Sequence, residues 1–99
     1  MGRRRITEVD VPLIAERFKA LSEPSRIALL LAMRAGERTV TQLVTATQMS
    51  QANTSKHLQV LHTHGLVTRR KVGLFVYYAM AGRKAITLCE LIRDPSPIS

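Results

Sequence analysis

Acidic residues are missing from the middle of this chain: none occurs between Glu37 and Glu90. Seven of the 15 basic residues fall within that gap, so most of the net charge of +8 belongs to it. A surface that is charged only for solubility usually mixes both signs. A surface that neutralises phosphates needs bases without neighbouring acids. The gap therefore predicts a face that binds nucleic acid, and a basic face that is merely solvated is the alternative.

Cysteine and aromatic residues are also scarce. The single cysteine, Cys89, excludes an internal disulfide and any metal site made from several thiolates of one chain. With no tryptophan, two phenylalanines and two tyrosines, the core must be mostly aliphatic. We expect Cys89 to be a small buried apolar residue or, alternatively, a thiol that meets its counterpart at a dimer axis.

Long apolar runs and catalytic motifs are absent as well. The longest apolar run, residues 27–33, is too short to cross a membrane. The arginines near the N-terminus precede residues 6–10, which read ITEVD and do not form the apolar segment of a secretory signal. The chain shows no paired carboxylates, nucleophile elbow or phosphate-binding glycine loop. We therefore expect a cytoplasmic protein with no membrane partner, no cofactor and no enzymatic activity.

The signals that are present divide the 99 residues into three parts. Residues 1–9 are predicted to be a basic flexible arm, residues 10–93 a single folded domain, and residues 94–99 a tail that contains proline. Apolar residues at helical spacing predict four helices between residues 10 and 65. The residues expected to start or end these helices are Asp10, Pro24, Gly36, Thr39 with Gln42 as a capping box, Ser50 and Gly65.

Beyond Gly65 the apolar period changes from about four residues to two. Residues 66–71 and 74–80 are predicted strands, with Val72 and Gly73 as the turn of a β-hairpin. A last helix is predicted over residues 83–92. Two short helices joined by a tight turn and followed by a hairpin indicate a mostly helical α+β fold. The expected architecture is a winged helix-turn-helix with about five helices and a two-stranded β-hairpin wing.

The fourth helix is the candidate for reading the major groove of DNA. When Thr54, Leu58 and Leu61 face the core, helical periodicity turns a polar side outward. This side is short, polar and free of acids, which suits contacts with base edges, and the bases of the wing suit contacts with phosphates. The predicted DNA contacts are Gln51, Ala52, Ser55, Lys56 and Gln59 on the helix and Arg69, Arg70 and Lys71 on the wing.

These segments also resemble a known family. Residues 18–26, which read FKALSEPSR, resemble the F-x-x-L-x-x-P-x-R opening of the ArsR/SmtB family of bacterial repressors, and residues 50–61 resemble its recognition helix. Residues 65–67 and 76–78 fall where its wing strands begin and return. The resemblance implies a homodimer, built on the first and last helices, that binds a near-palindromic operator. The residues expected in the dimer contact are Ile14, Phe18, Ala85, Leu88, Cys89 and Ile92.

The chain departs from the metal-sensing members of that family. Their third helix often carries a cysteine-containing box, whereas residues 40–44 here read VTQLV. Gly82 and Lys84 stand where the zinc ligands of other members begin, and paired-cysteine redox sensors need two thiols. His62 and His64 are two residues apart, so a helix directs them away from each other and they cannot chelate one ion together. We therefore expect no metal site.

Together these patterns predict a dimeric, sequence-specific regulator of transcription that binds double-stranded DNA and represses a promoter palindrome. It is expected to lack the usual metal-sensing motifs of the family. Two alternatives are left. One is an architectural protein that binds DNA without sequence preference. The other is a protein-interaction module that uses the apolar tip of the wing and the last helix.

Overall fold

Five α-helices and a small sheet make up the described part of the protein, residues 4–95 of a computed structural model. A single turn of 3-10 helix, Glu8–Asp10, precedes them. The helices are α1 (Val11–Leu21), α2 (Pro24–Ala32), α3 (Val40–Thr47), α4 (Gln51–Thr63) and α5 (Lys84–Arg93). The strands are β1 (Arg38–Thr39), β2 (Val67–Val72) and β3 (Phe75–Met80). Within residues 4–95, no helix has the length and apolar character needed to cross a membrane.

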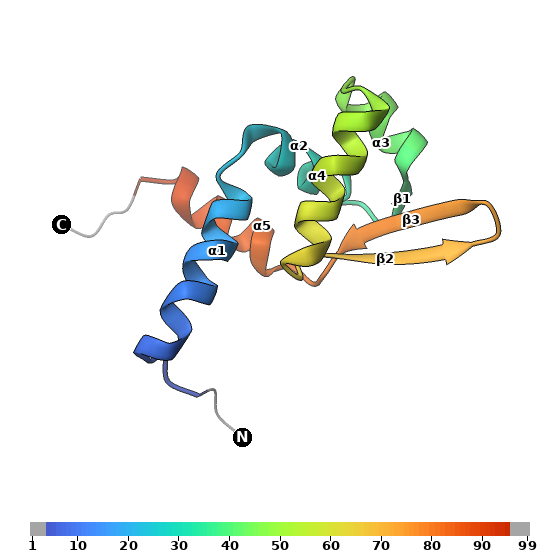
Figure 1. Cartoon of the computed structure of the whole chain (residues 1–99). Coiled ribbons are helices and arrows are strands. Elements are labelled where there is room, and N and C mark those ends of the chain that lie inside the picture. The colour runs from blue at the N-terminus through green and yellow to red at the C-terminus, as the bar shows by residue number, and fades with distance from the viewer. Residues whose placement is uncertain (1–3, 96–99) are drawn as a thin grey trace.

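The strands form a sheet in the order β1-β3-β2, and both neighbouring pairs are antiparallel. Figure 1 shows β2 and β3 as a ribbon that extends away from the helices on one side, while α1 and α5 lie on the other. Helix α4 crosses the middle, packed against α2 and α3. This confirms the predicted winged helix-turn-helix. Strand β1 was not anticipated, because two residues are too few to show a period.

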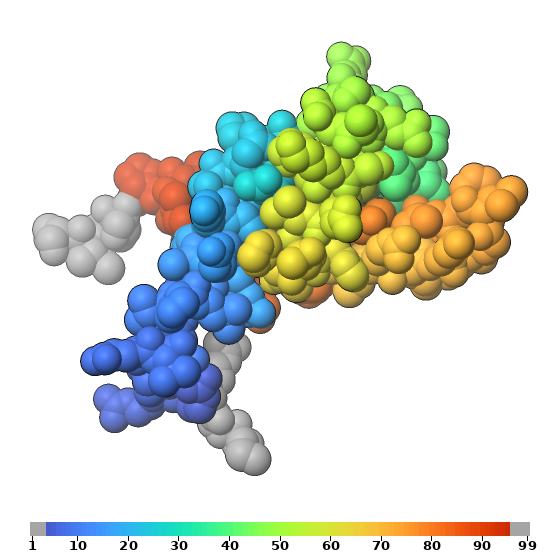
Figure 2. Space-filling view, viewed as in Figure 1, coloured from blue at the N-terminus to red at the C-terminus, as the bar shows by residue number. Residues whose placement is uncertain are grey.

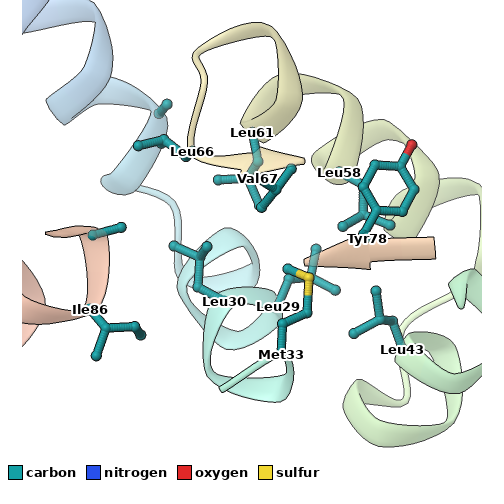
Figure 3. Packing of buried hydrophobic residues seen from close by; sticks show 12 residues of the cluster. Leu29, Leu30, Met33, Leu43, Leu58, Leu61, Leu66, Val67, Tyr78 and Ile86 are labelled. Carbon is teal, nitrogen blue, oxygen red and sulfur yellow. The ribbon is translucent and has the colours of Figure 1, made fainter. Parts of the chain in front are cut away.

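The core is mostly aliphatic, as the scarcity of aromatic residues predicts (Figure 3). Each leucine that is fully buried contributes roughly 1.5–3 kcal/mol relative to an exposed one, so this cluster fixes α2, α3, α4 and the sheet relative to one another. Helix α1 contributes one buried residue, Ala20, and the partly buried Leu21 packs against the cluster. The buried residues labelled in Figure 3 are Leu29, Leu30, Met33, Leu43, Leu58, Leu61, Leu66, Val67, Tyr78 and Ile86.

The predicted start signals of α3 and α4 are confirmed by their hydrogen bonds. Thr39 Oγ1 accepts from the Gln42 N–H (3.2 Å), and Gln42 Oε1 accepts from the Thr39 N–H (2.9 Å). At the start of α4, Ser50 Oγ accepts from the Asn53 N–H (3.1 Å). Each such cap stabilises its helix by about 1 kcal/mol. Pro24 occupies the first turn of α2, as expected.

Helix α2 ends earlier than predicted, at Ala32 rather than near Gly36. The chain tightens after Ala32 into turns with hydrogen bonds between residues three apart. The Arg34 N–H donates to the Leu31 carbonyl (3.1 Å), and the Gly36 N–H donates to the Met33 carbonyl (3.1 Å). This tightening satisfies the last carbonyls of the helix.

The hairpin turn lies one residue later than predicted, at Gly73 and Leu74. Val72 pairs with Phe75 in the ladder, so Val72 belongs to the strand. Gly73 has a φ of +58°, and a two-residue hairpin turn requires a positive φ at this position. Gly73, the last residue of the predicted turn, is therefore the first residue of the observed turn.

Part of the predicted flexible arm has regular structure. The Arg4 guanidinium donates to both carboxylate oxygens of Asp10 (2.8 and 3.1 Å), and the Thr7 N–H donates to the same carboxylate (2.9 Å). The bonds from Arg4 and Thr7 hold the pKa of Asp10 below its usual value. They hold the residues before α1 against its first turn. Residues 1–3 of the arm and 96–99 of the tail lie outside the described residues.

Candidate nucleic-acid interface

Helix α4 is held in place by one fully buried side. Thr54, Leu58 and Leu61 are all 0% exposed, as predicted. Thr54 Oγ1 donates to the Ser50 carbonyl (2.8 Å), so its hydroxyl is buried with a hydrogen-bond partner. Because α4 packs against α2, α3 and β2, this buried side determines which side of the helix faces solvent.

The opposite side of α4 is polar and exposed, and Figure 2 shows the helix, in yellow-green, at the surface. Asn53 is exposed too, although it was not among the predicted contacts. Amides, a hydroxyl and one ammonium group can bond to base edges or to phosphates. Contact with DNA stays a prediction for these residues. All five residues predicted on this helix are exposed: Gln51, Ala52, Ser55, Lys56 and Gln59.

The turn between α3 and α4 depends on one residue in an uncommon conformation. Gln48 has a φ of +59°, in the left-handed region, and its N–H donates to the Val44 carbonyl (2.7 Å). This conformation costs a non-glycine residue about 1–2 kcal/mol. It lets the chain pass from Thr47 to Gln51 in three residues, and so sets the angle between the two helices. A tight connection was predicted here, but this conformation was not.

The three predicted basic contacts of the wing do not form one group. In the β2–β3 ladder Arg69 lies opposite Tyr78 and Lys71 lies opposite Val76. Since Tyr78 and Val76 pack into the core, Arg69 and Lys71 project from the core side of the sheet, where α4 also packs. Both are exposed. Arg70, which lies between them in sequence, projects from the other face.

Arg70 is engaged by protein groups on its own face of the sheet. Its guanidinium pairs with Glu37 and lies 5.0 Å from the centre of the Tyr77 ring. The hydrogen bond from Arg70 holds the pKa of Glu37 below its usual value, and the same bond raises the pKa of Arg70. Glu37 is the last acid before the acid-free stretch of the sequence. The fold places it beside Arg70, which was predicted to contact DNA. Arg70 is therefore the wing base least suited to bind phosphate.

A polar cluster that sequence reasoning missed joins α4 to the corner between α1 and α2. Arg26 donates from Nε to the Ala20 carbonyl (2.6 Å) and from Nη1 to His57 Nδ1 (3.2 Å). Because arginine only donates, His57 Nδ1 is the acceptor in this contact, and the other ring nitrogen, Nε2, lies 3.5 Å from Glu23 Oε2. Arg26 was noted only as part of a motif. Its partners become visible only in the fold.

The residues most able to bind a metal ion are spread through the structure. In the part of the chain from residue 4 to residue 95, no three His, Cys, Asp or Glu side chains are arranged to hold one. His57 is bonded to Arg26, and Cys89 is a free, half-buried thiol on α5. The expectation of no metal site stays a prediction.

An apolar groove is lined by residues of α1, α2 and α5. Figure 1 shows α1 and α5 on the side of the molecule away from the wing. Its volume is about 680 Å³. Phe18, Leu31 and Ile92 border it and are 46%, 44% and 69% exposed. Contiguous apolar surface of this kind usually marks a contact with another molecule. The apolar residues that line the groove are Phe18, Leu21, Ile27, Leu31, Ile86, Leu88, Cys89 and Ile92.

Only four of the six residues predicted in the dimer contact line this groove. Ile14 and Ala85 lie instead at a smaller hollow of about 180 Å³. Ala85 is only 7% exposed and belongs to the core, so it has little surface left for a partner. Leu31 was missed because α2 is apolar nearly all round, and periodicity alone did not show which side is open. The four predicted residues that line the groove are Phe18, Leu88, Cys89 and Ile92.

The amino-acid sequence is similar to those of known regulators of transcription. Residues 23–69 match a family model described as "Bacterial regulatory protein, arsR family". The chain is 36% identical over 81 residues to a transcriptional repressor SmtB homolog of Synechocystis, which covers 82% of this chain and 61% of that protein. It is 31% identical over 91 residues to the cadmium resistance regulatory protein CadC of Listeria innocua, which covers 91% and 76%.

Solved structures agree. The solution structure of a homodimeric winged helix-turn-helix DNA-binding domain from Mycobacterium bovis matches with a TM-score of 0.79 at 32% identity, over 94% of this chain and 86% of that one. The chain spans 61% of the Synechocystis repressor, and 35% and 49% of two Mycobacterium tuberculosis regulators. This chain belongs to the arsR family of bacterial regulatory proteins, which are regulators and not enzymes.

Proposed function

We propose that two copies of this chain bind double-stranded DNA at a near-palindromic operator and repress the promoter that contains it. The place of action is the bacterial cytoplasm, where such an operator lies. The observation that carries the proposal is the geometry of α4, which has one fully buried side and one exposed, polar side without acids. Each copy places that exposed side in the major groove of one half-site.

The exposed side of α4 has the chemistry to distinguish bases. Gln51 can make a pair of hydrogen bonds to adenine, Lys56 can bond to guanine, and the Ala52 methyl group can contact the methyl group of thymine. On the wing, Arg69 and Lys71 project on the side where α4 packs. They supply phosphate contacts, which fix the register of the protein on the duplex.

The apolar groove supports a dimer. Helix α1 buries only Ala20 within its own chain, and Phe18, Leu31 and Ile92 are open to solvent. When a second copy packs its own α1 and α5 against these helices across a twofold axis, each copy covers this surface of the other. Such a pair presents its two α4 helices to half-sites about 34 Å apart. The Mycobacterium bovis domain with the same fold is homodimeric, which supports a dimer of this chain.

Repression is steric in this proposal, because a protein on the operator excludes the polymerase. The Synechocystis relative is described as a transcriptional repressor, which supports this direction of control. We infer that the releasing signal differs from the usual metals of the family. The third helix carries no cysteine, and each chain supplies only the Cys89 thiol.

A gel-shift titration tests the role of α4. The probe is a duplex that the wild-type protein selects from a random-sequence library. The double variant Ser55→Ala/Lys56→Ala removes two exposed polar groups. Because each specific base contact is worth about 1–3 kcal/mol, it is expected to bind this duplex about tenfold or more weakly. Its affinity for random DNA should fall much less.

The matched control is Lys19→Ala, which removes a lysine from an exposed position on α1. It is expected to change affinity by no more than about twofold, because charges far from the duplex are screened by salt. Unchanged retention of the selected duplex by a folded double variant contradicts the proposal. A wild-type protein that enriches no sequence supports the architectural alternative instead.

A further inference from the structure

The tip of the wing is apolar and exposed. Leu74 is 96% exposed, Phe75 60% and Val72 46%. Figure 2 shows the hairpin, in orange, projecting from the body of the molecule in the same view that shows the surface of α4. Apolar side chains on a projecting turn add nothing to the core. A cluster of them usually marks a contact surface.

The charges near the tip indicate what it contacts. Arg69 and Lys71 lie on the strand that leads into it, and both are exposed. The chain has no acid from residue 38 to residue 89, and Glu37 is occupied by Arg70 on the other face. Such unbalanced positive charge attracts a polyanion. The minor groove of DNA combines rows of phosphates with apolar sugar walls, so it fits a tip that is apolar at its end and basic along its side.

We propose that Leu74 acts as an apolar wedge, which enters the minor groove beside each half-site and makes the protein prefer DNA that deforms there. Apolar side chains inserted from the minor groove partly unstack a base step and kink the duplex. The pyrimidine–purine steps TA and CA/TG deform most easily. This inference rests on the proposed function. It adds a source of specificity that needs no hydrogen bond to a base.

The hairpin is built to present this side chain. Strands β2 and β3 pair continuously up to Val72 and Phe75, so the tip is carried by a ladder rather than by a loose loop. Leu74 follows Gly73, which has no side chain, and no heavy atom lies within 4 Å of where a Cβ at Gly73 would stand. A rigid ribbon that ends in one prominent apolar side chain positions that group with little loss of entropy on binding.

Parallel selection from a random-sequence duplex library tests the inference with three forms of the chain: wild type, Leu74→Ala and Leu74→Lys. The wild type is expected to enrich a palindrome together with TA or CA/TG steps at a fixed distance outside each half. Both variants are expected to keep the palindrome, because α4 is unchanged, and to lose the outer steps. Since Leu74 is 96% exposed, neither substitution removes a core contact.

Fluorescence anisotropy then compares two duplexes that share the palindrome and differ only in a flanking TA step or a stiff A-tract. The wild type is expected to prefer the TA duplex by about tenfold. Leu74→Ala is expected to bind both duplexes equally, with an unchanged dependence on salt because no phosphate contact is lost. The matched variant Lys71→Ala is expected to keep the preference and to lower the salt slope by about one.

Each result of these two experiments either supports or contradicts the role of Leu74. If the wild type selects a palindrome without outer steps, or if Leu74→Ala keeps them, the inference is wrong and the proposed function stands. Binding of a protein partner is then the better explanation for the exposed apolar side chains of the tip. If Leu74→Lys keeps the preference, an apolar side chain at residue 74 is not what produces it, and the inference is also wrong. A wild type that selects no sequence at all overturns both the inference and the proposed function.

Discussion

Arg70 illustrates how the face of a strand decides the role of a single residue. Its neighbours Arg69 and Lys71 project on the side where α4 packs, whereas Arg70 pairs with Glu37 and lies over Tyr77 on the other side. An ion pair between two exposed groups contributes little to stability. Its main effect is to neutralise one base of the wing.

The variant Arg70→Ala is expected to raise the pKa of Glu37 towards the ordinary glutamate value of about 4.3, because the hydrogen bond from Arg70 lowers it in the wild type. The stabilisation from this pair is present above that ordinary value and is lost as the pH falls through the lowered pKa. An NMR titration of the Glu37 carboxyl group measures the shift. Arg69→Ala removes a base from the other face and should leave this pKa unchanged; equal effects of the two variants contradict the pairing.

Gln48 is a second residue with a role that follows from its conformation. Its φ of +59° suits glycine better than glutamine. Gln48→Gly is therefore expected to raise the free energy of unfolding by up to about 1 kcal/mol, as measured by urea denaturation. The contrasting variant Ala46→Gly, in the regular part of α3, is expected to lower it by about 1 kcal/mol. A loss of stability in Gln48→Gly argues against strain at this turn.

At the scale of whole elements, the corner between α1 and α2 is joined to α4 by a single side chain. The guanidinium of Arg26 donates to the Ala20 carbonyl at the end of α1 and to His57 on α4. Arg26 itself belongs to α2. One side chain therefore connects three helices, and it provides a cation at the C-terminal end of α1, where the helix dipole favours one.

Arg26→Ala is expected to lower the free energy of unfolding by about 1–3 kcal/mol, because the Ala20 carbonyl and His57 Nδ1 both lose their donor. Urea denaturation measures the loss, and hydrogen exchange should show faster opening at the end of α1. Arg83→Ala is the matched control. Arg83 is exposed and makes no capping bond through its side chain, so its removal should change stability by no more than about 0.5 kcal/mol. Equal losses in both variants contradict the connecting role.

At the scale of the whole molecule, two different surfaces lie at opposite sides of an elongated shape. The principal extents are 46 × 30 × 23 Å. The groove between α1, α2 and α5 is apolar, whereas the exposed side of α4 is polar and β2 carries exposed bases; only the tip of the wing is apolar. Because the two surfaces are separate, a second copy on the groove leaves α4 free to bind DNA.

Adjacent residues on α5 allow this arrangement to be tested. Leu91 and Ile92 are both 69% exposed, but only Ile92 lines the groove. Ile92→Asp is expected to give monomers in analytical ultracentrifugation, because it places a charge in the apolar contact. Its affinity for the palindrome should fall about 100-fold or more, since the second half-site no longer contributes. Leu91→Asp should remain dimeric; a dimer that survives Ile92→Asp lies on another surface.

Much of this architecture was predictable because its signals are local. The Thr39–Gln42 capping box, the Ser50 cap and the buried side of α4 all involve residues three or four apart, which any helix brings together. The family resemblance draws on these same local motifs. Periodicity likewise identified the hairpin, although its turn was misplaced by one residue.

The remaining features depend on residues that are distant in the chain. Arg70 meets Glu37 across 33 residues and Arg26 meets His57 across 31, while β1 finds its partner in β3. No periodic pattern encodes such pairs, because the packing of helices and strands decides which distant side chains meet. The amino-acid order thus specified which helix is the candidate for reading DNA and which side of it is polar. The three-dimensional packing decided which base of the wing pairs with an acid and where the exposed apolar groove lies.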